Sequence, residues 1–327
     1  MPRISVVIPA HNSEKTIVKT IDSVLKQSFT DFELIVINDG SHDKTCDVVS
    51  KINDSRIKVL SYPKAGANVS RNRGLALAQG EFVSFLDADD IWAPDKLASQ
   101  LQTLENNCNA KVAYSWTNYI DDEDKFLLTG THITANGDVY EQLLITNFLE
   151  SGSNPLICKD TILTLGGFDE SLTAAQDWDM WLRLANKYNF VCVPKPQILY
   201  RIRANSLSSN LARQEKVCLD VLSKAYKIRP NTNQQVINLS LAKLYNYLTC
   251  RALYQPHNRQ KGLLAASFII KNFIYDSSRL KRLKLTLKLV FKISVIILFP
   301  SAWSTAILTS IKGAKTPTNE LETTGTL

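Results

Sequence analysis

Three aspartates stand within four positions, at Asp87, Asp89 and Asp90, directly after a short apolar run at residues 82–86. A run of that length is typical of a strand buried on both faces. Because side chains alternate along a strand, Asp87 and Asp89 should point to the same side where it ends. Two carboxylates this close repel each other unless a cation lies between them, and oxygen ligands suit Mg²⁺ or Mn²⁺. The alternative is a loop in which Asp89 or Asp90 only caps the following helix.

The elements around these acids follow a regular alternation through the first third of the chain. We predict strands at residues 4–9, 32–37, 57–61 and 81–86, and helices at residues 16–27, 44–52 and 67–78. Strands that alternate with helices of this length form right-handed βαβ units. The sequence therefore predicts an α/β fold with a mostly parallel sheet.

Polar clusters follow three of these strands, at residues 11–12, 38–41 and 87–90. Ligands of open α/β sheets bind beyond the carboxyl ends of the strands, so the three clusters should meet at one edge. Neither a G-x-G-x-x-G fingerprint nor a Walker A loop follows the first strand, which argues against a dinucleotide dehydrogenase or a P-loop enzyme. A nucleotide at this edge would be held mainly by side chains and a metal.

The net charge of +7 over 327 residues is unevenly distributed. Residues 256–315 carry eleven Lys or Arg and one acid, so this stretch holds +10 and the remainder −3. We therefore expect no nucleic-acid partner for the N-terminal part and an anionic surface facing the C-terminal part. The six cysteines lie far apart and the N-terminus has no signal-peptide pattern, which predicts free thiols in the cytoplasm without a zinc site.

Six short motifs occur in order: ISVVIPAHN at residues 4–12, NDGS at 38–41, SRN at 70–72, FLDADD at 85–90, GGFDE at 166–170 and QDWD at 176–179. Together they resemble the family 2 glycosyltransferases of the GT-A fold, in which the sheet is Rossmann-like. Each motif alone is weak, whereas six in order at family-like separations are specific. The resemblance covers about residues 4–205 and leaves the last third of the chain unexplained.

The resemblance implies a role for individual residues. The general base would be Asp177, and the ligands of a Mg²⁺ or Mn²⁺ ion would be Asp89 and Asp87. The residues implied at the donor are Pro9, His11, Asn12, Asp39, Arg71, Asp87 and Arg203, and those on the acceptor side are Gly167 and Trp178. Asp177 falls in the first turn of a predicted helix, a placement that supports its role in removing a proton from an acceptor hydroxyl.

The implied activity is inverting transfer of a sugar from a nucleotide-diphosphate sugar, UDP-sugar by default, to a hydroxyl of a glycan or lipid-linked acceptor. Three departures from the family pattern, at His11, Asn38 and Gln176, leave a second hypothesis open. In that hypothesis the chain is a catalytically silent sugar-nucleotide-binding or membrane-associated protein on the same fold. The retained aspartates of the metal site and of the base favour the enzyme.

Several of these residues also have a purely structural interpretation. Asp39 could form an Asx-turn, and Arg71 could pair with a structural acid instead of a diphosphate. Asp177 could stabilise the start of its helix, and Arg203 could be an ion-pair partner where the family often has histidine. The acid run at residues 121–124 is interpreted as a solvated loop tip.

The chain divides into a glycosyltransferase domain, a helical basic extension and a flexible tail. Their expected bounds are residues 1–206 (nucleotide part about 1–110, acceptor part about 111–206), 207–315 and 316–327. The acceptor part is less regular over residues 111–147 and ends in two predicted strands, at 190–193 and 197–203.

The extension carries helical patterns at residues 211–227, 235–253 and 262–274. A basic amphipathic segment at residues 279–292 then leads into an uncharged stretch at 293–311, which is typical of attachment to an anionic membrane surface. A single span and an ordinary buried helix are the alternatives, and Pro300 weakens the span. We expect a cytoplasmic protein, peripheral on the inner face of the cell membrane through residues 279–311.

Overall fold

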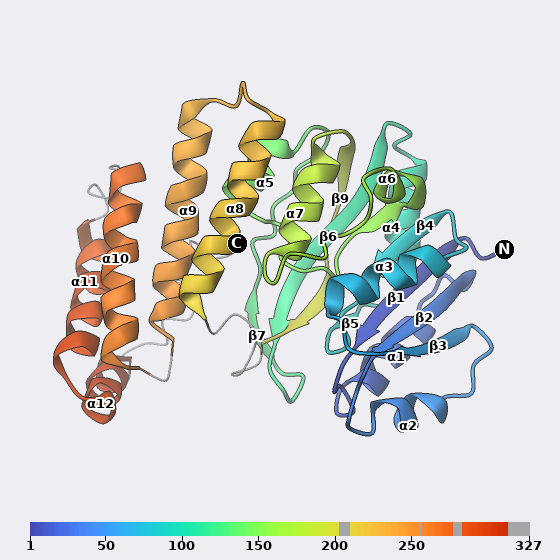
Figure 1. Cartoon of the computed structure of the whole chain (residues 1–327), viewed down its shortest axis with the longest axis horizontal. Helices are drawn as coiled ribbons and strands as arrows, with labels where there is room; N and C mark the ends of the chain where they lie inside the picture. The colour runs from blue at the N-terminus through green and yellow to red at the C-terminus, as the bar shows by residue number, and fades with distance from the viewer. Residues whose placement is uncertain (203–209, 255–256, 277–282, 313–327) are drawn as a thin grey trace. The chain divides into compact units, whose positions relative to one another are not determined.

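The computed structural model describes residues 1–202, 210–254, 257–276 and 283–312 (Figure 1). The strands are β1 Ile4–Ala10, β2 Phe32–Asp39, β3 Ile57–Tyr62, β4 Phe82–Phe85, β5 Ile91–Trp92, β6 Ala110–Ile120, β7 Phe126–Thr129, β8 Leu156–Cys158 and β9 Asn189–Arg201. The helices are α1 Ile17–Leu25, α2 Thr45–Ser50, α3 Ala67–Leu77, α4 Lys96–Glu105, α5 Tyr140–Ile145, α6 Lys159–Thr164, α7 Gln176–Ala185, α8 Leu211–Ile228, α9 Gln234–Ala252, α10 Arg259–Tyr275, α11 Leu283–Leu298 and α12 Ser301–Lys312.

The strands form one sheet in the order β3-β2-β1-β4-β8-β6-β9-β5, with β7 paired to β6. The first four are parallel, as the βαβ pattern predicts. Strand β8 then runs antiparallel between β4 and β6, and the pair β6 and β9 is parallel again. The α/β fold is confirmed, but the sheet is mixed and not mostly parallel, because β5, β7 and β8 pair antiparallel with their neighbours. Its parallel part brings the ends of β1, β2 and β4 to one edge.

The last sheet strand differs from its prediction. One continuous strand, β9, replaces the two strands predicted at residues 190–193 and 197–203. Its pairing with β6 shifts register beside Pro196: Ser115 lies opposite Val193, and Trp116 lies opposite Pro196. Proline cannot donate a hydrogen bond to a neighbouring strand, but it is tolerated at such a bulge. Its presence within β9 is the reason that the sequence predicted two strands.

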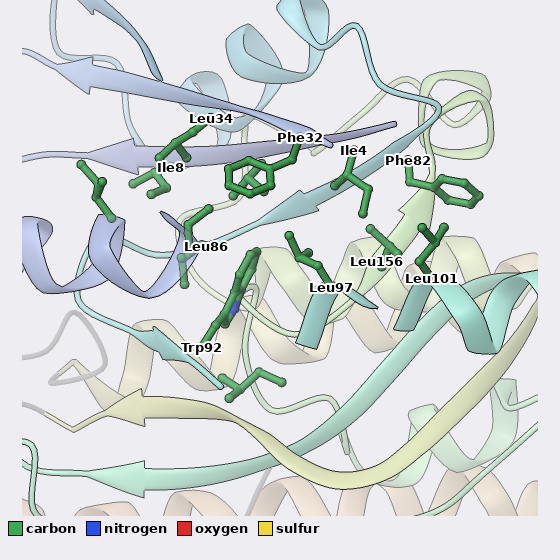
Figure 2. Close-up of a cluster of buried hydrophobic side chains, with 14 of the residues drawn as sticks. Ile4, Ile8, Phe32, Leu34, Phe82, Leu86, Trp92, Leu97, Leu101 and Leu156 are labelled. Carbon is green, nitrogen blue, oxygen red and sulfur yellow. The ribbon is translucent and has the colours of Figure 1, made fainter. Parts of the chain in front are cut away.

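The main core packs α1 and α4 against one face of the sheet. The members labelled in Figure 2 come from β1, β2, β4 and the residue after it, β5, β8 and α4: Ile4, Ile8, Phe32, Leu34, Phe82, Leu86, Trp92, Leu97, Leu101 and Leu156. Lys96 is fully buried beside it, with its ammonium 3.8 Å from the Trp92 ring centroid and 2.6 Å from Ser84 Oγ. Burial lowers the pKa of Lys96 well below its usual range.

The chain forms two compact units, one of residues 1–143 with 148–206 and one of 144–147 with 207–327. In the second, α8, α9 and α10 lie within one to three residues of their predicted bounds. Each begins after an asparagine whose side chain accepts a backbone N–H of the first turn, at Asn210, Asn233 and Asn258. Gly262 lets α10 meet α11 closely, because a Cβ there would lie 2.8 Å from Ile297 Cγ1.

Pro300 separates the two helices at the end of the described chain. Helix α11 has 16 residues and α12 has 12, and the uncharged stretch 293–311 is divided between them. None of the helices in the described part of the chain combines the length and the apolar character needed to cross a membrane.

Candidate active site

The loop after β4 meets a buried arginine of α3. Arg71 Nη2 lies 2.5 Å from Asp87 Oδ1, and the arginine side chain is 7% exposed where that of Asp87 is 29% exposed. Asn68 Oδ1 accepts a second guanidinium hydrogen at 3.4 Å. Arg71 therefore pairs with an acid of the protein, as its structural interpretation predicts. This ion pair also holds Asp87, one of the expected metal ligands, in place.

The third acid of the loop has a structural role. The carboxyl of Asp90 is buried, and it accepts the Ser153 hydroxyl at 2.5 Å and the backbone N–H of Arg201 at 3.0 Å. The Ser153 oxygen in turn accepts the backbone N–H of Asp87 at 3.0 Å. Burial, with the charges of Asp89 and Asp87, raises the pKa of Asp90 well above its usual range.

Asp177 lies at the start of α7, after Ala175 in the left-handed region at φ 51. Its Oδ1 accepts the backbone N–H of Trp178 at 2.9 Å, which is the helix-stabilising contact expected of an acid there. Burial raises the pKa of Asp177, while the nearby charge of Arg71 lowers it and that of Asp87 raises it. Asp177, the residue expected to be the base, is thus influenced by the charge of Asp87, an expected metal ligand.

Tyr200, near the end of β9, is also influenced by the aspartates of both the β4 loop and α7. Burial raises its pKa well above the usual range, and four surrounding carboxylates add to the effect. Those carboxylates are Asp90, Asp87, Asp89 and Asp177. Motifs about 90 residues apart in the sequence therefore meet around one phenol.

Helix α3 also positions the loop that leads to α7. Asn72 accepts the backbone N–H of Phe168 at 2.8 Å and donates to its carbonyl at 2.9 Å. Gly166 and Gly167 lie in the left-handed region at φ 78 and 76, and a Cβ on Gly167 would lie 2.5 Å from Asn72 Oδ1. Gly167, expected on the acceptor side, is thus explained by backbone conformation and by this close approach.

At the ends of β1 and β2, the residues expected at the donor bind one another. Asp39 accepts the backbone N–H groups of Ala65 and Gly66, both at 2.8 Å, and so folds that segment over the strand end. His11 Nδ1 lies 2.9 Å from the Asp39 carbonyl, which can only accept, so this nitrogen carries the proton. His11 Nε2 is then an acceptor for the ammonium of Lys64 at 3.0 Å.

Asn12 ties the same two loops together. Its backbone N–H donates to Ser41 Oγ at 3.0 Å, and its side-chain oxygen accepts the backbone N–H of His42 at 2.9 Å. Pro9 is half-buried within β1, opposite Ile37. The predicted meeting of the polar clusters after β1 and β2 is therefore present.

One residue expected at the site, Trp178, is not presented there. Trp178 is 2% exposed and donates its indole N–H to the Leu143 carbonyl at 2.7 Å, so it supports α7 from the core and offers no surface to an acceptor. Arg203 lies outside the described residues. Its neighbour Arg201, which drew no prediction, instead contacts the Asp87–Asp90 loop.

The acid run at residues 121–124 is also more than a solvated tip. Asp124 pairs with Arg201 and with Lys19 of α1, and the carbonyl of Asp121 accepts a hydrogen from the Arg201 guanidinium at 2.5 Å. Asp122 and Glu123 are exposed as a solvated tip predicts, but the interpretation was wrong for Asp121 and Asp124, because the cations that they meet lie more than 70 positions away in the sequence.

The residues present fit a divalent metal that is completed by its substrate. Asp87 and Asp89 are partly exposed carboxylates on the same loop, and their charges add to the effect of burial in raising the pKa of Asp90 and of Tyr200. Within the described ranges, no three His, Cys, Asp or Glu side chains come together as a complete metal-binding group. A cation held by one or two carboxylates and substrate phosphates needs no such group.

Comparison with solved structures identifies the fold of the chain. Staphylococcus aureus TarS in complex with UDP-GlcNAc superposes with a TM-score of 0.56 at 19% identity, over 91% of this chain and 80% of that one. The mannosyltransferase PcManGT of Pyrobaculum calidifontis, in complex with GDP-Man and Mn²⁺, gives 0.58 at 18%, over 96% and 87%. The fold is the GT-A fold of glycosyltransferases, with a helical C-terminal region.

The family follows from sequence. Residues 5–252 match the model described as glycosyltransferase like family 2, and the chain belongs to that family. Two similar Escherichia coli proteins are UDP-Glc:alpha-D-GlcNAc-diphosphoundecaprenol beta-1,3-glucosyltransferases. WfaP is 32% identical over 69% of this chain and 89% of its own length, and WfgD is 32% identical over 67% and 85%. The protein is a glycosyltransferase, as the motifs predicted.

Proposed function

We propose that this enzyme transfers a sugar, with inversion at C1, from a UDP-sugar to a hydroxyl of a lipid-linked or glycan acceptor. The observation that carries the proposal is that α3 binds Asp87 through Arg71 and, through Asn68 and Asn72, the loop that leads to Asp177. The charges of Arg71 and Asp87 also act on Asp177. A base and a diphosphate site must be neighbours if one sugar carbon is to be attacked and released in a single step. The names of the two E. coli relatives support the donor and a lipid-diphosphate acceptor.

In the proposed reaction, the acceptor oxygen bonds to C1 as the bond from C1 to the diphosphate oxygen breaks on the opposite face. Asp177 takes the proton of the acceptor hydroxyl. Its pKa is raised toward neutral pH. A general base is most effective when its pKa lies near the pH at which the enzyme works. Asp89 and Asp87 would hold a Mg²⁺ or Mn²⁺ ion, which when bound supplies positive charge for the departing diphosphate.

The enzyme is proposed to act at the cytoplasmic face of the cell membrane. The product of its reaction would be used in the synthesis of a polysaccharide. The excess of positive charge in residues 256–315 supports binding to an anionic lipid surface. So do large apolar side chains that α11 and α12 leave exposed: Leu287, Val290, Phe291, Leu298 and Trp303. We assign the donor and acceptor parts to residues 1–206 and membrane contact to the region 279–311.

Calorimetric titration of UDP, with Mn²⁺ or with EDTA, tests the donor site. We expect Mn²⁺ to tighten UDP binding well beyond its affinity in EDTA, and Asp89→Ala should abolish this tightening, because that variant removes a ligand. Asp177→Asn should keep the binding but lower kcat for transfer by about 10²- to 10⁴-fold, the usual contribution of a general base. If UDP, GDP and dTDP all fail to bind wild type, the silent GT-A protein becomes the better hypothesis.

A further inference from the structure

The guanidinium of Arg201 is enclosed at the end of β9, with its side chain 1% exposed. Its Nε donates to the backbone carbonyl of Asp89 at 2.9 Å. Its Nη1 donates to the carbonyl of Asp121 at 2.5 Å, and its Nη2 pairs with the Asp124 carboxylate. One side chain therefore joins the loop after β4 to the turn between β6 and β7.

The backbone of Arg201 makes a second contact with the same loop, through its N–H to Asp90 Oδ1 at 3.0 Å. The Asp89 carbonyl and the Asp90 side chain lie on either side of one peptide bond. Because a peptide unit is planar, holding its carbonyl and the side chain attached at its far end restrains the orientation of that plane. Arg201 therefore restrains the backbone from which the Asp89 side chain leaves.

The far end of this connection is itself held in place. Asp124, at φ 66, pairs with Lys19 of α1 as well as with Arg201, and hydrogen bonds from both cations lower its pKa despite partial burial. Asp121 Oδ1 accepts the backbone N–H groups of Glu123 at 2.8 Å and Lys125 at 2.9 Å. The turn is thus a formed support for the guanidinium.

We propose that Arg201 and Asp124, here called the Arg201 clasp, are positioning residues that orient Asp89 for the divalent metal. The inference rests on the proposed function in so far as Asp89 is a metal ligand. Neither residue touches the reacting atoms. Lysine cannot replace the arginine, because a single ammonium lacks the planar fork that reaches three separate acceptors.

The clasp is tested with Arg201→Lys, which keeps the charge. Mn²⁺ affinity in the presence of UDP is measured by water-proton relaxation, and UDP affinity is measured in EDTA. We expect Mn²⁺ to bind about 10- to 100-fold more weakly, the usual effect of losing a partner that orients a ligand, with UDP affinity in EDTA unchanged. The Mn²⁺ concentration for half-maximal transfer should rise in parallel, and kcat should recover at saturating Mn²⁺.

Asp124→Asn provides a second variant. It removes the charge of the acceptor but keeps a polar side chain beside Arg201. It should weaken Mn²⁺ binding too, by less than Arg201→Lys does. Glu123→Gln is the matched control, since this side chain is 71% exposed on the same turn and pairs with Lys125. It should bind Mn²⁺ as wild type does. Thermal melts of all three confirm that the comparison is made on folded protein.

Two results would overturn the clasp. The first is unchanged Mn²⁺ affinity in both Arg201→Lys and Asp124→Asn. The second is an equal loss of UDP affinity in Mn²⁺ and in EDTA, which would mean that Arg201 acts through the general fold of the donor site. Failure of wild type to bind UDP in a metal-dependent way would instead contradict the proposed function.

Discussion

At the scale of single residues, several ionisable groups are buried in the part of the first unit that follows β4. Asp90 and Arg201 have hydrogen-bond partners for their charged groups there. Glu150 is a further case, 9% exposed and in the left-handed region at φ 68. The backbone N–H of Thr131 donates to its Oε1 at 2.7 Å, yet burial raises the pKa of Glu150 to about 8.

That pKa predicts a dependence of stability on pH. An ordinary glutamate, as in the unfolded chain, releases its proton near pH 4.5, whereas the folded protein keeps the proton to about pH 8. The unfolded state thus binds fewer protons in this window, so the contribution of Glu150 to stability is full below pH 4.5 and is lost as the pH rises to 8. Glu150→Gln, which keeps an acceptor for Thr131, should remove this loss and gain at least about 1 kcal/mol over wild type between pH 5 and pH 8.

Urea unfolding at pH 5, 6.5 and 8 measures the difference between variant and wild type. Taking the difference cancels the titration of other groups common to both proteins. Glu141→Gln, at an exposed position, is the control and should show no trend. Parallel stability curves for Glu150→Gln and wild type would contradict the buried, protonated state.

The residues named by motif and those named only by structure differ in a physical way. Asp87, Asp89 and Asp177 stand in short local patterns, so their roles could be proposed from neighbours in the sequence. Arg201 acts on Asp89 from 112 positions away, and Ser153 acts on Asp90 from 63 positions away. No local pattern reports such a contact, because it exists only after folding has brought the end of β9 and the loop before β8 to the loop that follows β4.

At the scale of elements, α3 connects the donor and acceptor parts of the site. Arg71 on one side of it binds Asp87, while Asn68 and Asn72, one turn apart, hold the loop before α7. The helix lies close to β1, since a Cβ on Gly74 would lie only 2.2 Å from Val7 Cγ1. The distance between α3 and the sheet therefore determines the positions of the polar groups of Arg71, Asn68 and Asn72.

Gly74→Ala should accordingly displace α3 and affect both stability and donor binding. Overpacking a tight contact of this kind destabilises by about 1–3 kcal/mol. We expect a lower Tm and weaker binding of UDP in the presence of Mn²⁺. Val7→Ala removes the methyl groups that the new Cβ meets, so the double variant should recover part of both losses. Additive losses in the double variant, measured as a double-mutant cycle, would show that α3 does not depend on this contact.

Elements were predicted from the sequence where they are periodic and uninterrupted. The strands β1 to β4 and the helices α8 to α10 match their patterns within a few residues. The 13-residue β9 was divided in two because Pro194 and Pro196 interrupt its pattern. Those prolines lie at a register shift opposite β6, a feature that depends on the partner strand and cannot be found in β9 alone.

At the scale of the whole molecule, charge and apolar surface follow the division of the chain. The stretch 256–315 carries +10, whereas the remainder carries −3. On α11, side chains spaced by three or four residues form two faces: Leu289, Ile293 and Ile296 are buried, while Leu287 and Phe291 are exposed. Lys284 and Lys288 lie on the exposed face, which suits a helix lying in a lipid interface.

The full chain should therefore bind vesicles that contain anionic lipid and not those made only of phosphatidylcholine. Each basic residue near such a surface contributes about 1 kcal/mol, so reversing two charges in Lys284→Glu/Lys288→Glu should weaken partitioning at least tenfold. Trp303→Ser should weaken it further at high salt, where the apolar contribution of this side chain, 66% exposed, remains. Lys51→Glu/Lys187→Glu changes the net charge equally in the first unit and serves as the control. Cosedimentation measures all four proteins, and equal losses in the two charge-reversal variants would mean that net charge alone draws the protein to the membrane, without a surface on α11 and α12.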